Sequence, residues 1–188
     1  MSPHRSAQAE PIDKTPPPAG AANKTPPPAG AAYLLLDVAG VPCALPRAAV
    51  SEVLPLPNLF RPPTLGPLLA GFLNLGGEPV PVVDLARLFG LRAEAREPGA
   101  YDHLVLAADR ATAFLVDRAS DLVTVAPEAV RPVSGRQTLN GCVEAEITLG
   151  DRLVHALAPG RILTVEEQER LSALTRAAQE RLAALSAG

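Results

Sequence analysis

The side chains most able to bind a metal or to act as a base or nucleophile are few and scattered. The three histidines lie far apart, two of them alone within apolar, strand-like runs: His4, His103 and His155. Cys43 and Cys142 also lie apart in apolar runs, without a C-x-x-C or Cys/His spacing. Zinc sites need Cys and His ligands clustered at short spacing, whereas an isolated cysteine in such a run is usually a packed thiol. We therefore expect no metal site, no disulfide and no cofactor.

The carboxylates do not form an acid–base pair either. They occur singly at strand ends and in turns, where Asp more often caps than catalyses: Asp84, Asp109, Asp117 and Asp121. No G-x-S-x-G motif, P-loop or dinucleotide fingerprint is present. The pair Gly76-Gly77 lacks the Lys-Ser/Thr that follows the glycines of a phosphate-binding loop. With no catalytic residue to nominate, the sequence predicts a binding protein and not an enzyme.

Composition narrows the class of partner. The chain has 188 residues, of which 47% are hydrophobic but only 3% aromatic, so a sizeable core must be aliphatic. A net charge of −3 without a dense basic run argues against nucleic acid or an anionic membrane as the main partner. No apolar stretch is long enough to span a bilayer, and residues 1–32 lack the apolar region of a signal peptide. We expect a cytoplasmic protein without direct membrane insertion.

The first 32 residues differ from the rest of the chain. The sequence DKTPPPAGAA (13–22) recurs as NKTPPPAGAA (23–32). Proline triplets favour an extended polyproline II backbone, and Ala/Gly spacers loosen it, which is typical of a disordered tail or linker. The alternative is a ligand for a proline-binding groove.

Residues 164–188 are predicted to form an amphipathic helix. Thr164 and Glu167 have the spacing of a capping box. Apolar residues then follow at intervals of three or four, as on one helix face: Leu171, Leu174, Ala178, Leu182 and Leu185. We expect this face to pack on the rest of the protein, with contact to a partner helix as the alternative.

Between these two segments, short apolar runs alternate with turn residues in an order that occurs twice. The first copy has runs at 33–38, 41–45, 50–56, 72–75 and 80–83, followed by a short helix that Asp84 can cap. The second copy has runs at 103–107, 111–116, 121–125, 141–147 and 152–157. Ser51 and Gly71 have counterparts in Ser120 and Gly141. We predict a mainly β fold of two tandem five-stranded barrels within residues 33–163, with units of about 33–91 and 101–163.

Three stretches resemble the CheW-like chemotaxis adaptor family: VPCALPRAAVSEVL (41–54), GFLNLGGEPVPVVDLARLFGL (71–91) and AFLVDRASDLVTV (113–125). The middle stretch is the most specific, since the family has Gly-apolar-apolar-Asn-Leu-Arg-Gly and then Val-Pro-Val-x-Asp-Leu there. The resemblance covers about residues 33–163. It implies two fused SH3-like barrels and an adaptor without catalytic activity, recruited to membrane-associated receptor arrays. Such adaptors couple the histidine kinase CheA, through its regulatory domain, to the cytoplasmic tip of methyl-accepting chemoreceptors.

The resemblance also assigns residues to two surfaces. The first is an interface with the kinase regulatory domain, on the third strand: Val50, Glu52 and Val53. The second is a receptor groove at the following hairpin: Asn74, Leu75, Gly76, Gly77 and Asp84. Structural roles compete with these assignments, because Asn and Gly are turn residues and Asp84 can cap a helix.

Departures from the family pattern leave other functions open. Gly76 replaces the family's Arg, which removes a cation with five hydrogen-bond donors. The second copy has Ala-Leu-Ala-Pro at 156–159 where an Asp-Leu step is expected. These changes favour an accessory or array-spacer protein that binds the CheA regulatory domain or other CheW-like proteins but not a receptor. A small-molecule sensor with an apolar cavity between the barrels, and a hydrolase without a recognisable motif, are the alternatives from other classes.

Overall fold

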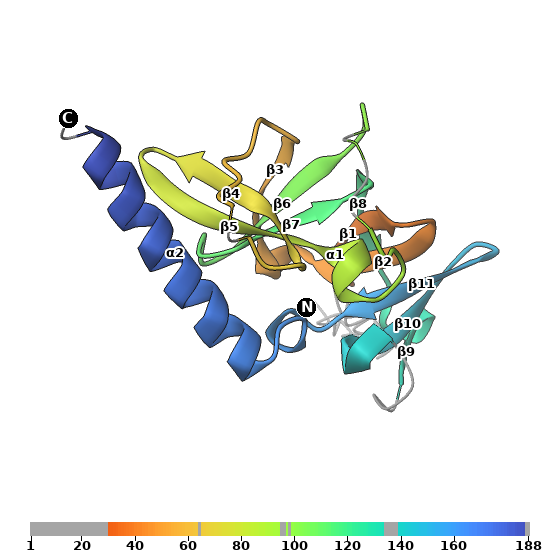
Figure 1. Cartoon of the computed structure of the whole chain (residues 1–188). Helices are drawn as coiled ribbons and strands as arrows, with labels where there is room; N and C mark the ends of the chain where they lie inside the picture. Colours follow the sequence, from red (N-terminus) through yellow and green to blue (C-terminus); the bar gives the residue numbers. More distant parts are fainter. Residues whose placement is uncertain (1–29, 64, 95–96, 98, 134–138, 187–188) are drawn as a thin grey trace, which may run out of the picture.

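The structure is a computed structural model that describes residues 30–63, 65–94, 97, 99–133 and 139–186 (Figure 1). The repeat predicted as a tail lies outside these residues, except for its last three positions. Two of those belong to the first strand, which begins at Ala31. Within the described residues, no helix is both long and apolar enough to cross a bilayer.

The chain is mainly β and forms two sheets. The larger sheet has the order β8 (Arg118–Val125), β1 (Ala31–Val38), β2 (Val41–Pro46), β11 (Arg152–Leu157), β10 (Val143–Leu149) and β9 (Val130–Pro132). The smaller sheet has the order β3 (Val50–Pro55), β6 (His103–Ala107), β7 (Ala113–Val116), β5 (Glu78–Asp84) and β4 (Leu69–Leu75). The prediction of a two-barrel β fold is confirmed. The short strand β9 is an addition to the predicted set.

The two sheets do not follow the two sequence units, because each unit contributes its first hairpin to the other unit's sheet. The β1–β2 hairpin pairs with β8 and β11, and the β6–β7 hairpin pairs with β3 and β5. Equivalent strands nevertheless occupy equivalent places, since β2–β11 and β7–β5 are both parallel pairs. The expectation that units 33–91 and 101–163 each build one barrel is therefore wrong. A repeated apolar pattern identifies equivalent strands but not the copy with which each one pairs.

Three buried clusters account for the packing. One lies within the larger sheet and includes Tyr33, Ala44, Ile147 and Val154. Another lies within the smaller sheet and includes Leu73, Val82, Leu104 and Leu106. The third takes residues from both sheets and includes Leu36, Leu45, Leu85, Val105 and Leu157. This shared cluster fixes the two barrels against each other, and the core is largely aliphatic, as the composition requires.

One α-helix follows the second hairpin of each unit. Helix α1 (Leu85–Leu88) begins at Asp84, and α2 (Val165–Ser186) follows the 3-10 turn η4 (Pro159–Arg161). The predicted capping box of α2 is present, since the Thr164 amide donates to Glu167 Oε2 at 2.8 Å and the Glu167 amide donates to Thr164 Oγ1 at 3.2 Å. Leu171 and Leu174 of the predicted apolar face pack on the core, and Ala178 is only 2% exposed, whereas the side chain of Leu185 lies outside the described part of the structure. Helix α2 runs along the β4–β5 hairpin and packs on β5 (Figure 1).

Candidate partner-binding surfaces

The third strand of the first unit presents a small exposed surface. In β3, Glu52 is exposed and the Val53 side chain is 36% exposed. Val50, by contrast, is 5% exposed and belongs to the core cluster that both sheets share. The pairing of β3 with β6 shifts register between Val50 and Glu52, which is the signature of a β-bulge. Glu52 and Val53 are therefore accessible on the surface, whereas Val50 belongs to the core.

Strand β8 repeats this surface in the second unit. Asp121 is exposed and the Leu122 side chain is 52% exposed. Both β3 and β8 lie at one end of their sheet order, where a strand has only one neighbour. Ser51 of β3 and Ser120 of β8 are the counterparts found in the sequence, and each is followed by an acidic and then an apolar residue, but β8 was not predicted as a site. That match was the signal for a second acidic and apolar edge surface.

The β4–β5 hairpin places four of the predicted groove residues at its tip. Gly76 and Gly77 have φ angles of +65° and +97°, as in a type I′ turn. The Gly77 amide donates to Asn74 Oδ1 at 2.7 Å. Asn74 therefore has a turn-forming role, although its side chain is exposed. Leu75 is half-buried, and a side chain at Gly76 would meet nothing within 4 Å.

Asp84 lies at the opposite end of β5 from this tip. Six residue steps along a strand span about 20 Å, so the structure does not bring Asp84 together with Asn74–Gly77. The carboxylate is 6% exposed and accepts a hydrogen bond from the Arg87 amide at 3.2 Å, which caps α1. The capping role of Asp84 is confirmed.

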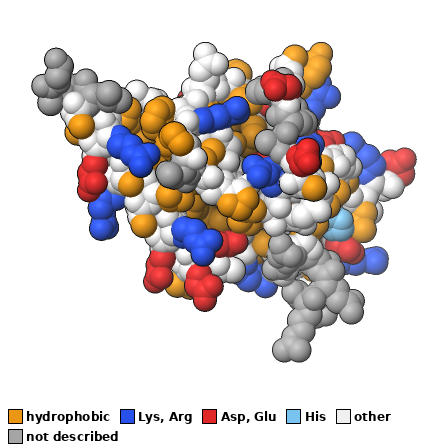
Figure 2. All heavy atoms as spheres, viewed as in Figure 1, with side chains coloured by type: hydrophobic (Ala, Val, Ile, Leu, Met, Phe, Trp, Pro, Cys, Tyr) orange, Lys and Arg blue, Asp and Glu red, His pale blue; other side chains and the backbone are white. Residues whose placement is uncertain are grey.

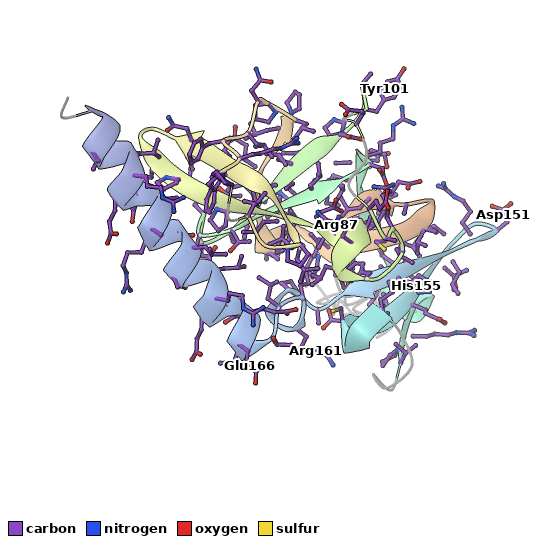
Figure 3. The ribbon with its side chains drawn as sticks, viewed as in Figure 1. Arg87, Tyr101, Asp151, His155, Arg161 and Glu166 are labelled. Atoms are coloured by element: carbon purple, nitrogen blue, oxygen red, sulfur yellow. The ribbon has the colours of Figure 1, made fainter. Side chains whose placement is uncertain are left out.

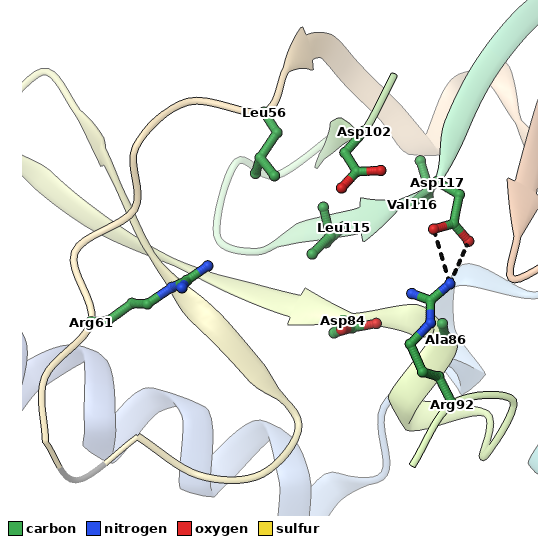
Figure 4. A pocket seen from close by; sticks show the side chains of 9 residues that line it. All are labelled: Leu56, Arg61, Asp84, Ala86, Arg92, Asp102, Leu115, Val116 and Asp117. Carbon is green, nitrogen blue, oxygen red and sulfur yellow. Dashed lines mark hydrogen bonds and ion pairs between the residues drawn. The ribbon is translucent and has the colours of Figure 1, made fainter. Parts of the chain in front are cut away.

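A water-sized cavity of about 20 Å³ lies beside Asp84 (Figure 4). Arg92 donates to both carboxylate oxygens of Asp117 at 3.1 and 3.2 Å. Across the cavity, the buried Asp102 accepts from the Gly99 amide at 2.8 Å, and Arg61 donates Nε to the Ala70 carbonyl at 2.9 Å. These pairs connect the segment after α1 and the Pro-rich connector to the barrels. The cavity is too small for a ligand beyond a single water.

A larger groove of about 960 Å³ runs between α2, β5 and the β6–β7 turn. Its lining comes from both sheets and from α2, and includes Leu45, Leu75, Glu78, Phe114, Leu163 and Leu171. In Figure 2, charged side chains lie along the outer edge of α2, and hydrophobic side chains gather between α2 and the middle of the molecule. Of the residues assigned to a receptor groove, Leu75 is the one that lines this groove.

Among the described residues, the two cysteines form neither a disulfide nor a metal site. Cys43 and Cys142 are free and buried. Burial, followed by the nearby charge of Asp37, raises the pKa of the Cys43 thiol to about 12. Burial is also the main cause that raises the pKa of Cys142. Arg87, Tyr101 and His155 come from separate elements (Figure 3), and the described part of the chain has no group of three potential metal ligands.

Comparison with known proteins agrees with this architecture. The model of the CheW-like domain matches residues 32–167. The chain is also similar to the crystal structure of the scaffolding protein TtCheW from Thermoanaerobacter tengcongensis, with 18% sequence identity and a TM-score of 0.63. That similarity covers 74% of this chain and 92% of the other, and at this identity it bears on the fold alone. No curated protein matches the sequence.

Proposed function

The chain belongs to the CheW-like domain family, and from this premise we propose that it is a non-catalytic adaptor that couples chemoreceptors to the histidine kinase CheA. The adaptor acts in the cytoplasm at membrane-associated chemosensory arrays. The observation that carries the proposal is the presence of two surfaces at opposite ends of one sheet: the edge strand β3 with Glu52 and Val53, and the hairpin β4–β5 beside the groove. A protein with two such surfaces can hold two partners at once.

The β3 surface is proposed to bind the regulatory domain of CheA. An exposed apolar side chain beside a carboxylate is suited to a contact in which Val53 is desolvated and Glu52 orients a partner. Glu52→Arg should weaken binding of the CheA regulatory domain by roughly tenfold or more, because the charge at the contact is reversed. Glu169→Arg on the outer face of α2 is the matched control, since Glu169 is exposed and away from β3. Equal affinities for the two variants, measured by titration calorimetry, would remove β3 from the kinase interface.

The groove beside the hairpin tip is proposed to bind the helical cytoplasmic tip of a methyl-accepting chemoreceptor. An apolar floor with charged residues on the rim fits an amphipathic helix. Gly76→Arg tests whether the tip belongs to this site. Open space surrounds Gly76, although its φ of +65° costs a non-glycine residue on the order of 1 kcal/mol in folding stability. A gain in affinity for a receptor-tip fragment supports the assignment, and an unchanged affinity removes Gly76 from it.

A second candidate function is an accessory or array-spacer protein that binds CheA or other CheW-like proteins but no receptor. The duplicated edge surface favours it, since Asp121 and Leu122 on β8 repeat the chemistry of Glu52 and Val53 on β3. Two similar edge surfaces suit a chain that links two barrel proteins side by side. Binding of the CheA regulatory domain without binding of receptor-tip fragments would select this function over the adaptor.

A further inference from the structure

One face of α2 lines the groove. The residues on it recur every three or four positions and lie just beyond the family match at 32–167: Gln168, Leu171, Ser172, Thr175, Arg176 and Gln179. At 1.5 Å per residue, this row is about 17 Å long, or three helical turns. The groove therefore has a straight wall that the family resemblance does not account for.

This wall is fixed to the barrel. The neighbouring face of α2 packs on the shared core through Leu174 and the buried Ala178, and Leu171 lies at the boundary between the core and the groove. Near the other end of the row, Gln179 Nε2 donates to Glu78 Oε2 at 2.9 Å, which ties α2 to the first residue of β5. Because α2 is held at both places, its groove-facing row is a preformed surface.

The two hydroxyl side chains of the row already have hydrogen-bond partners within α2. Ser172 Oγ donates to the Gln168 carbonyl at 2.9 Å, and Thr175 Oγ1 donates to the Leu171 carbonyl at 2.9 Å. A partner that covers these hydroxyls leaves no donor unsatisfied, so burial there costs little. Ser172 is exposed and small, which lets another backbone approach α2 closely. The row is suited to close packing more than to hydrogen bonding.

The facing edge of β5 excludes a β-strand as the occupant. Strand β7 pairs with β5 only at Val82–Asp84, which leaves the edge of β5 at 78–81 without a strand neighbour on that side. In a two-residue hairpin, the closing pair Leu75–Glu78 is hydrogen-bonded across the two strands. Hydrogen-bonded pairs alternate with pairs that are not, so the backbone nitrogens of Pro79 and Pro81 point away from β4 toward the open edge. Proline has no N–H to donate, and the edge cannot pair with an added strand.

We propose that α2 is part of the partner-binding surface and that the groove receives an amphipathic helix lying along Gln168–Gln179. The apolar side of that helix covers Leu75, Leu163 and Leu171, which line the groove and are half-buried. The backbone of the bound helix approaches α2 at Ser172, as in close helix packing. The inference rests on the proposed receptor contact and deepens it, because it makes the segment beyond the family match a determinant of which helix binds.

The test introduces bulk into the row of the full-length chain. Ser172→Arg places a long charged side chain in the groove, and Ala173→Arg makes the same change one residue on, at an exposed position that does not line the groove. Ser172→Ala is the conservative variant, because its lost hydroxyl bonds only within α2. Each variant is titrated with a helical receptor-tip fragment and separately with the CheA regulatory domain. Helicity is checked by circular dichroism.

Ser172→Arg is expected to lower affinity for the receptor-tip fragment by roughly tenfold or more relative to Ser172→Ala, while Ala173→Arg stays within about twofold of the parent chain. None of the three changes is expected to affect binding of the CheA domain. If Ser172→Arg binds the receptor fragment as well as Ala173→Arg does, the inference is wrong and the adaptor function stands. A parent chain that binds the CheA domain but no receptor fragment also overturns the inference and selects the accessory function. Binding to neither probe overturns the proposed function itself.

Discussion

Gly71 leads the hairpin that carries the candidate receptor surface, and its replacement by alanine tests how that hairpin is held. A Cβ at this position would lie 2.7 Å from Leu59 Cβ and 3.0 Å from the Phe60 carbonyl oxygen. The connector cannot easily move away, because Phe60 and Phe72 exchange two backbone hydrogen bonds of 2.9 and 2.8 Å. The φ of Gly71 is +153°, which side chains rarely adopt. Gly71→Ala therefore combines backbone strain with a steric clash.

The expected loss follows from these two terms. Strain at a backbone angle of this kind costs about 1–3 kcal/mol, and an extra methyl group in a packed site costs about 1–3 kcal/mol. Allowing for partial relaxation, Gly71→Ala should lower the free energy of unfolding by about 2–4 kcal/mol. For a chain of this size, each kcal/mol shifts Tm by about 2–4 °C.

Urea unfolding followed by circular dichroism measures this loss. The control is Gly66→Ala, where a Cβ would meet nothing within 4 Å. That variant should remain within about 0.5 kcal/mol of the parent chain or be slightly more stable. If Gly71→Ala is as stable as Gly66→Ala, the connector is not packed against the hairpin as described, and the reasoning about this surface fails.

Two further predictions concern buried side chains. Asp84→Ala should cost about 1 kcal/mol of unfolding free energy through loss of the α1 cap, whereas Asp84→Asn should retain the cap; equal stabilities in urea would contradict the capping role. Burial raises the pKa of Cys43 from 9.0 to about 12, so the folded state keeps the thiol proton over a pH range in which the unfolded chain releases it. The contribution of this thiol to folding stability is therefore fully present below pH 9 and is lost as the pH rises toward 12. The free energy of unfolding should fall between pH 9 and 11, and less steeply in Cys43→Ala; equal slopes would contradict this, as would a native Cys43 that reacts with a thiol reagent at pH 8.

Features that depend on neighbours in sequence were predictable. The turns at Ala39-Gly40, Gly76-Gly77 and Gly150-Asp151 connect antiparallel strands as the turn residues indicate. The capping box at Thr164 and the cap at Asp84 are also present. Each of these features needs only a few adjacent residues to form a hydrogen bond or to adopt a positive φ. Local chemistry therefore sufficed to place strand ends and helix starts.

Features that depend on the pairing of distant strands were not predictable. The exchange of the β1–β2 and β6–β7 hairpins leaves every apolar alternation unchanged, so periodicity could not reveal it. The bulge between Val50 and Glu52 buries a valine that the family resemblance placed at an interface. The family resemblance grouped Asp84 with the hairpin tip, yet an extended strand separates them. The groove wall at Ser172 could not be predicted, because it exists only through the docked position of α2.

Simultaneous binding of two partners is the most direct test of the adaptor function. The full-length chain is first saturated with the CheA regulatory domain and then titrated with a helical receptor-tip fragment. Because the β3 surface and the β4–β5 hairpin lie at opposite ends of the smaller sheet, we predict a ternary complex with receptor affinity within about threefold of that measured without CheA. Competition between the two partners, or binding to neither, would contradict it.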